Sequence, residues 1–303
     1  MTLWHLVIPV VVGLVLAFIW WAGRAVLEGA REGLQEANVE LAQEKADREA
    51  QEVQKAEDRR QRVETAALSR TEAERFALNL RAPFTQLWIQ IFEDPTSGRP
   101  LEYFYGFTPP AGKEDELRSS LEEGWGITDH ASAMSSLAWL LGGGGHHSPY
   151  QEVRQSLQGG TTRNLDRRLA TLVGKWEPEV GEVGGLAFDL ARAADIAAQG
   201  MALGYLGEVQ GWQVLGQCCR MARDAGFRDW AHYGQSFLAG AEFWKSGGVT
   251  DGLRNRGYAQ TVKWLLENKD SPWQRYPWPA PGGWPGPSAG PETDIPEART
   301  TLN

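Results

Sequence analysis

An apolar segment close to the N-terminus sets the first limit on how this chain can fold. The segment runs from Leu6 to Gly23, reads LVIPVVVGLVLAFIWWAG and holds no Asp, Glu, Lys or Arg. Eighteen such residues in a helix, at about 1.5 Å per residue, are long enough to cross the hydrocarbon core of a bilayer. We therefore predict a transmembrane anchor in residues 1–23, with the lipid bilayer as the partner of residues 6–23.

Two other interpretations of this segment are weaker. A cleavable signal peptide carries basic residues before its apolar stretch and a small-residue cleavage site after it. Neither is present, because residues 1–5 hold no Lys or Arg and the stretch ends near Trp20 and Trp21, whose rings suit the headgroup boundary. A buried core helix is seldom this long and this uniformly apolar.

Arg24 and Arg31 follow the span, and basic residues favour the cytoplasmic side, so we expect a single-pass protein whose body is cytoplasmic.

Composition limits the kind of partner that the rest of the chain can have. The net charge is -9 and the isoelectric point is near 5.2, which argues against nucleic-acid binding and against a polybasic lipid-binding patch. A hydrophobic content of 42% with 14 Trp is ample for one globular core. The two cysteines, Cys218 and Cys219, are adjacent and are interpreted as small buried side chains. We expect a protein or small-molecule partner, with a protein favoured.

A long helix is predicted between the anchor and the domain. Residues 24–81 are rich in Ala, Glu, Gln, Arg and Lys and contain no Pro, which is typical of a helical stalk. Apolar residues from Leu27 to Leu41 follow a heptad spacing, but Glu44 and Arg48 occupy the next core positions. The pattern permits a homodimer through a coiled coil close to the membrane and disfavours one along the whole stalk.

The predicted fold class is mainly α, with one small β element. Pro83 is expected to end the stalk. In the connector at residues 82–113, the segments QLWIQIF (86–92) and LEYFYGF (101–107) flank a turn-rich stretch and predict a β-hairpin, although such short runs also suit a buried helical turn. A compact all-α domain is expected at 114–278. Its helices are predicted near residues 128–141, 150–157, 164–176, 186–203, 209–225, 229–245 and 251–268.

The C-terminal segment is different in composition. Half of the 16 prolines fall after Ser271, which predicts a Pro/Gly-rich disordered tail at residues 279–303. Trp273, Trp278 and Trp284 are apolar enough to fold back onto the domain.

Several motifs follow one another along the domain. The first is Trp125-Gly126-Ile127-Thr128-Asp129, followed by Trp139-Leu140 and then Gly145-His146. The central one runs from Phe188 to Arg192 and is followed by Gly204-Tyr205. The later ones comprise Trp230, Tyr233, Gly240, Phe243, Trp244, Ser271-Pro272-Trp273 and Pro277-Trp278. Together these motifs resemble the signatures of a bacterial family called domain of unknown function twelve-sixty-six.

This resemblance covers about Leu117 to Trp278, with the motifs in the family's order. The chain departs from it at the four glycines of residues 142–145 and at Leu206-Gly207-Glu208, where members usually carry polar or acidic residues. The resemblance implies an architecture, a bacterial source and hence an inner-membrane location, but no activity.

The candidate site residues are polar or aromatic positions of these motifs. Asp189, Arg192 and Asp195 are three residues apart on an otherwise apolar helix. An Arg between two carboxylates satisfies itself, so a structural ion-pair cluster is favoured over a polar site facing a cleft. Were the cluster a site, Asp129 and His146 would be the further catalytic candidates. Trp125, Tyr205 and Trp244 are the ligand-binding candidates, provided that they line one concave surface.

No metal or cofactor is predicted. His130, His146, His147 and His232 are four of five histidines, but adjacent histidines cannot easily point at one ion, and there is no HExxH spacing. The chain has no GxSxG, GxxxxGK[ST] or nucleotide-binding GxGxxG motif.

We therefore expect a membrane-anchored cytoplasmic binding or assembly module without catalytic activity. The alternative is a hydrolase-like enzyme whose polar site is built on Asp189 and Arg192. A further alternative is an immunity or defence protein at the inner membrane.

Overall fold

The computed structural model describes residues 24, 41–51, 53–54, 70–92, 114–160, 165–244 and 251–279, without the side chains of 89–92 and 251–255. The chain divides into two compact units, residues 1–58 and 59–303. Among the described residues, no helix has the length and apolar character that a membrane span requires. The predicted anchor at 6–23 and the tail at 280–303 lie outside them.

The described part of the first unit is helical and solvated. Residues 41–51 form helix, and all of their side chains are exposed. Arg48 lies 3.4 Å from Glu44, and Lys45 lies 4.0 Å from Glu49, each pair one helical turn apart. Such exposed pairs contribute only tenths of a kcal/mol. Leu41, the last residue of the predicted heptad pattern, is 64% exposed.

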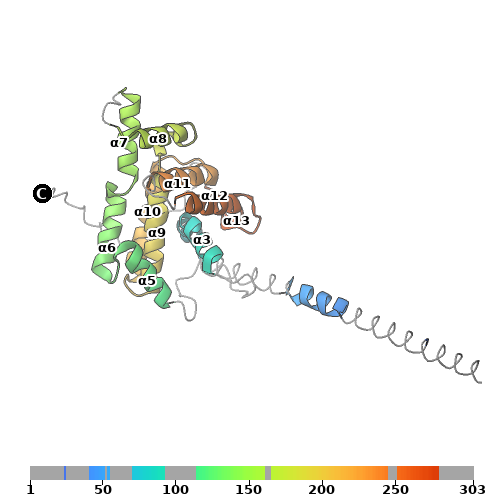
Figure 1. Ribbon diagram of the computed structural model, residues 1–303. Helices are drawn as coiled ribbons and strands as arrows, with labels where there is room; N and C mark the ends of the chain where they lie inside the picture. Colours follow the sequence, from blue (N-terminus) through green and yellow to red (C-terminus); the bar gives the residue numbers. More distant parts are fainter. Residues whose placement is uncertain are drawn as a thin grey trace, which may run out of the picture. The chain divides into compact units, whose positions relative to one another are not determined.

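The described part of the second unit is built of helices and contains no strand (Figure 1). Its α-helices are α2 (Glu72–Leu80), α3 (Ala82–Phe92), α5 (Glu114–Trp125), α6 (His130–Trp139), α7 (His147–Gln158), α8 (Arg167–Val180), α9 (Leu186–Ala202), α10 (Glu208–Asp224), α11 (Trp230–Trp244), α12 (Asp251–Glu267) and α13 (Pro272–Arg275). Those from α6 to α12 agree with the predicted helices to within a few residues. The all-α class is therefore confirmed.

The first strand of the predicted β-hairpin is wrong, because residues 86–92 belong to α3. Pro83 does not break this helix, since it is the second residue, where its missing N–H has no helical acceptor. Helix α3 packs against α9 and α12, and the ring of Phe84 lies 5.8 Å from that of Phe188 on α9 and 6.0 Å from that of Tyr258 on α12. A helix that contacts two neighbours can be apolar on more than one face, so its sequence need not show a single apolar stripe. The second predicted strand, 101–107, lies outside the described residues.

The prediction that the stalk continues to residue 81 is also wrong. Thr71 begins a separate helix, α2, through a capping box in which Thr71 and Glu74 satisfy each other's backbone N–H groups. Phe76, Leu78 and Leu80 are at most 4% exposed. Helix α2 packs against α9 and α10, so this segment belongs to the core of the second unit.

Helix α9 is the centre of the core. Helices α2, α3, α6, α10 and α11 all contact it. Many of its buried residues are alanines, whose small side chains let the surrounding helices approach closely. At the crossing with α11, a Cβ on Gly240 would lie 2.6 Å from the carbonyl oxygen of Gly185, so only glycine fits there.

The last described residues fold back and close the core, as predicted for Trp273 and Trp278. The ring of Trp273 is 2% exposed, stacks on Trp230 at 5.1 Å, and donates its N–H to the carbonyl of Asn79 at 3.0 Å. Trp278 lies 4.7 Å from Trp230 and 5.0 Å from Phe76. The C-terminal end of the domain is therefore packed against α2.

Candidate functional site

A glycine-rich loop after α6 forms one wall of the candidate site. Residues Leu140–Gly144 form a π-helical turn, and Gly143 has the left-handed φ of 85° that favours glycine. A Cβ on Gly145 would lie 2.3 Å from a carboxylate oxygen of Asp189. The glycines therefore let the loop backbone lie directly against α9.

Asp189 holds this loop in place. Its side chain is 2% exposed, and Oδ2 accepts a hydrogen bond of 2.8 Å from the backbone N–H of His147. Oδ1 lies 3.5 Å from Nδ1 of His146. Burial lowers the pKa of His147, while the charge of Asp189 opposes that shift. Asp189 thus fixes the start of α7 and the position of both histidines.

Arg192, one turn further along α9, is surrounded by rings. Its Cζ lies 4.1 Å from the ring centre of Trp125, 4.8 Å from Phe188 and 4.9 Å from Trp244. The residue is 8% exposed. Burial lowers its pKa to about 10, against an opposing effect of Asp189, so the guanidinium is still charged at pH 7.

A hydrogen bond from Arg192 sets the tautomer of His146. Nη1 of Arg192 lies 2.9 Å from Nδ1 of His146. A guanidinium only donates, so Nδ1 must accept and the neutral ring carries its proton on Nε2. The His146 side chain is 20% exposed.

Two large rings stand at the solvent side of this group. Trp139 is 45% exposed and Trp244 is 39% exposed. Their ring centres lie 6.0 and 6.1 Å from that of His146. We call the whole group the arginine-aromatic cluster; it comprises Trp125, Trp139, His146, Phe188, Asp189, Arg192 and Trp244.

The structure separates Asp195 from this cluster, contrary to the predicted ion-pair arrangement. Asp195 lies 3.5 Å from Nη1 of Arg81 and accepts a 2.6 Å hydrogen bond from Gln199. Among the described residues, no carboxylate oxygen lies within 4.0 Å of Arg192. The physical reason is competition from neighbouring segments: Arg81 at the end of α2 faces Asp195, and the His147 backbone takes Asp189, although the three-residue spacing would allow either carboxylate to reach Arg192.

The predicted candidates fall into two groups. His146, Asp189, Arg192, Trp125 and Trp244 come together in the cluster.

Asp129 and Tyr205 lie at the other end of α6. Asp129 caps the first turn of that helix by accepting the backbone N–H of Ser132 at 2.8 Å, and hydrogen bonds to Ser132 lower its pKa. The carbonyl of Tyr205 lies 2.9 Å from Nδ1 of His130. Among the described residues, no hydrogen bond or ring contact joins Asp129 or Tyr205 to His146 or Arg192, although Trp125 of the cluster is only four residues before Asp129.

The sequence did not predict three groups in and beside the cluster: the ring of Phe188, the ring of Trp139 and the backbone N–H of His147. Phe188 and Trp139 lie inside motifs of the family, but a residue pattern does not reveal which rings stay exposed. Among the described residues, no group of three or more His, Cys, Asp or Glu side chains is arranged to hold a metal ion.

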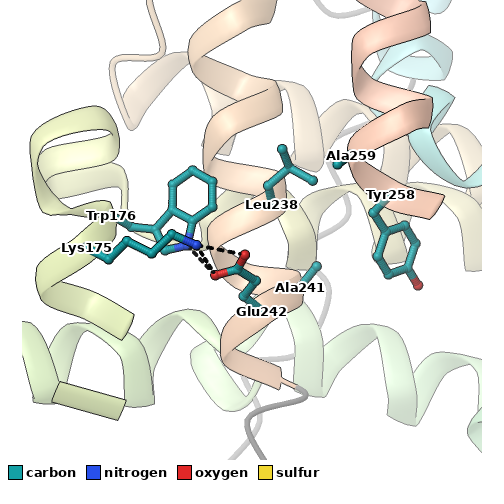
Figure 2. Close-up of a pocket in the computed structure, with 7 residues that line it drawn as sticks. All are labelled: Lys175, Trp176, Leu238, Ala241, Glu242, Tyr258 and Ala259. Atoms are coloured by element: carbon teal, nitrogen blue, oxygen red, sulfur yellow. Dashed lines mark hydrogen bonds and ion pairs between the residues drawn. The ribbon is translucent and has the colours of Figure 1, made fainter. Parts of the chain in front are cut away.

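A second candidate is a small hollow of about 180 Å³ between α8, α11 and α12, shown in Figure 2. Leu238, Ala241, Tyr258 and Ala259 supply its apolar surface. Lys175 forms an ion pair of 2.9 Å with Glu242, which also accepts the indole N–H of Trp176 at 2.8 Å (Figure 2). These polar groups satisfy one another, so the hollow offers a ligand mainly apolar contact.

Comparison with known proteins gives one match. The family profile described as protein of unknown function (DUF1266) matches residues 120–278, which include the whole arginine-aromatic cluster. No curated protein and no solved structure matches the chain.

Proposed function

The chain belongs to the DUF1266 family, and on that premise we propose that its helical domain is a non-catalytic binding or assembly module that receives a protein partner. The observation that carries the proposal is the exposure of Trp139 and Trp244, whose rings both lie about 6 Å from that of His146. Among the described residues of the second unit, three large apolar side chains are exposed, and two of them are these tryptophans. Exposed aromatic rings gathered around one polar group are typical of interaction sites.

The tautomer of His146 favours binding over hydrolysis. In a hydrolytic triad the imidazole donates Nδ1–H to a carboxylate and takes up a proton at Nε2. Here Nδ1 lies 2.9 Å from an Arg192 donor and 3.5 Å from Asp189, so the neutral ring already carries a proton on Nε2. Such a ring cannot act as a general base there.

The partner site is tested with the full chain in its host. We expect Trp139→Ser/Trp244→Ser to lose the proteins that cross-link to the wild type, because the exposed ring surface is removed. Val209→Ser is the matched control, since Val209 is 62% exposed on α10, outside the cluster. Unchanged cross-linking in the double variant, at an unchanged melting temperature, would contradict the proposal.

The enzyme is the second candidate, because the Asp189 carboxylate lies 3.5 Å from Nδ1 of the partly exposed His146 and, in the other tautomer with the proton on Nδ1, would orient the ring as in many hydrolases. Turnover of ester, peptide or nucleotide substrates by the purified chain, abolished in Asp189→Asn, would favour it over the binding module.

The proposal includes a membrane tether through residues 6–23, with the domain on the cytoplasmic side. This part is supported by the apolar sequence and by Arg24 and Arg31 after it. We expect the chain to resist carbonate extraction from membranes and to lose that resistance when residues 2–23 are deleted. A C-terminal alkaline phosphatase fusion should be inactive, and an active fusion would reverse the orientation.

A further inference from the structure

We infer that the arginine-aromatic cluster binds an oxyanion, a carboxylate or phosphate group carried next to an aromatic or apolar moiety, with Arg192 as its principal donor. The inference rests on the proposed binding role of the same cluster and names the chemistry that it recognises.

Arg192 supplies the hydrogen-bond donors. A guanidinium has five N–H donors. Among the described residues, one acceptor is present, Nδ1 of His146 at 2.9 Å, and no carboxylate oxygen lies within 4.0 Å. The remaining N–H groups are therefore available to an acceptor from outside the domain.

Three aromatic rings hold these donors in place. The rings of Trp125, Phe188 and Trp244 lie within 4.9 Å of Cζ and hold the guanidinium by cation–π contact. The hydrogen-bonding edge of a guanidinium lies in its own plane, where the two oxygens of a carboxylate or phosphate fit side by side. The rings thus preorganise Arg192 for a planar or forked oxyanion.

Arg81 offers an internal comparison for the charge of Arg192. Arg81 is 6% exposed and packs on the same helix, and it has the carboxylate of Asp195 at 3.5 Å. Arg192 is 8% exposed, but the nearest carboxylate, that of Asp189, accepts from the His147 backbone and faces His146. A buried cation without a contacting anion is costly, and a bound oxyanion would remove that cost.

The exposed rings of Trp139 and Trp244 indicate what the rest of the ligand is like. Trp139 and Trp244 are exposed beside His146, and Trp244 also lies 4.9 Å from Cζ of Arg192, so a ligand on Arg192 has exposed ring surface close by. An aromatic or apolar group next to the oxyanion would cover them. We therefore expect aromatic acids to bind more tightly than acetate or inorganic phosphate.

The experiment uses the full chain in a nonionic detergent and four probes: benzoate, phenyl phosphate, acetate and inorganic phosphate. Sodium chloride at equal ionic strength is the reference. We expect benzoate or phenyl phosphate to raise the melting temperature saturably, because a ligand of the native state stabilises it, and to bind about tenfold more tightly than its non-aromatic counterpart. Saturation-transfer NMR should place the probe's ring against the protein. Equal stabilisation by chloride, with no saturable binding of any probe, would overturn the inference.

Two variants test the role of Arg192. Arg192→Lys keeps the charge but loses the forked donors, and Arg192→Gln loses both; each should weaken binding of the aromatic acids by tenfold or more. Arg223→Gln is the control, since it removes an exposed arginine on α10 that pairs with Asp224. Should the Arg192 variants fail to fold, the wild-type titration against chloride still decides.

Competition separates the sources of the oxyanion and the two proposals. Displacement of the cross-linked protein by benzoate or phenyl phosphate would place the oxyanion on the partner, whereas probe binding without displacement would indicate a free small acid. Cross-linking that depends on Trp139 and Trp244, with no binding of any probe, would refute this inference and leave the proposed partner site standing.

Discussion

Asp195 provides the sharpest quantitative test of the buried polar groups on α9. Burial raises its pKa from 3.8 to about 6, although Arg81 and a hydrogen bond from Gln199 oppose the shift. The folded state therefore binds this proton more tightly than the unfolded state does. The stability that this group contributes is fully present below pH 3.8 and is lost as the pH rises through about 6.

The size of the effect follows from the difference between the two pKa values. A difference of about two units corresponds to about 3 kcal/mol in the free energy of unfolding. Asparagine matches the protonated aspartic acid in size and keeps an oxygen for Gln199, but it does not ionise. We expect Asp195→Asn and the wild type to be about equally stable near pH 4, and the variant to be about 3 kcal/mol more stable at pH 7.

The assay is urea unfolding of the full chain in detergent, followed by tryptophan fluorescence at pH 4, 5, 6 and 7. Burial lowers the pKa values of His147 and His232 below 6.5, so both destabilise the fold as the pH falls, but they are common to both proteins and cancel in the difference. Asp224→Asn is the control, because that carboxylate is 66% exposed beside Arg223. If the free energies of unfolding of Asp195→Asn and the wild type changed in parallel with pH, the raised pKa of Asp195 would be wrong.

Three further substitutions test the loop, the core and a cap, each by urea unfolding. Gly145→Ala places a methyl group 2.3 Å from an oxygen of Asp189 and should cost about 2 kcal/mol through the lost charge-assisted hydrogen bond; a cost below about 0.5 kcal/mol would contradict the close packing. Trp273→Ala should cost about 3–5 kcal/mol, because the ring is buried and stacked on Trp230, and a cost near that of a surface change would argue against the closed core. Asp129→Ala should cost about 1 kcal/mol through the lost N-cap of α6 and should leave aromatic-acid binding unchanged; weaker binding would bring this residue into the site.

The folding unit extends beyond the residues that the family profile matches. The profile begins at residue 120, whereas α2 and α3 occupy residues 72–92. The hydroxyl of Tyr233 donates to the carbonyl of Leu80 at 3.0 Å, and Trp273 donates to that of Asn79. The hydroxyl of Tyr233 also lies 3.2 Å from the carbonyl of Ala187, but the indole N–H of Trp273 depends on α2 for its buried hydrogen bond, so a fragment cut at residue 114 would leave that donor unsatisfied.

Local signals explain why most helices could be predicted. Asp129 before α6 and Gly226 after α10 are capping residues whose effect is confined to neighbouring backbone groups. The same local logic was available for α2, where Thr71 and Glu74 form a capping box. The residues before Thr71 have the composition of a solvated helix, and this composition masks the start of a new helix.

Local sequence signals are enough to identify the apolar segment, the helical class, the positions of α6 to α12 and the residues from which a site could be built. Tertiary packing decided the conformation of residues 86–92, because a short apolar run suits a strand or a buried helical turn equally, and α3, to which it belongs, packs against α9 and α12. It also decided the partners of the charged residues on α9. Asp195 meets Arg81, and Arg192 meets three rings and His146, and these contacts join residues far apart in the chain. Spacing along one helix cannot specify which neighbouring helix supplies the partner, since that depends on how the helices pack.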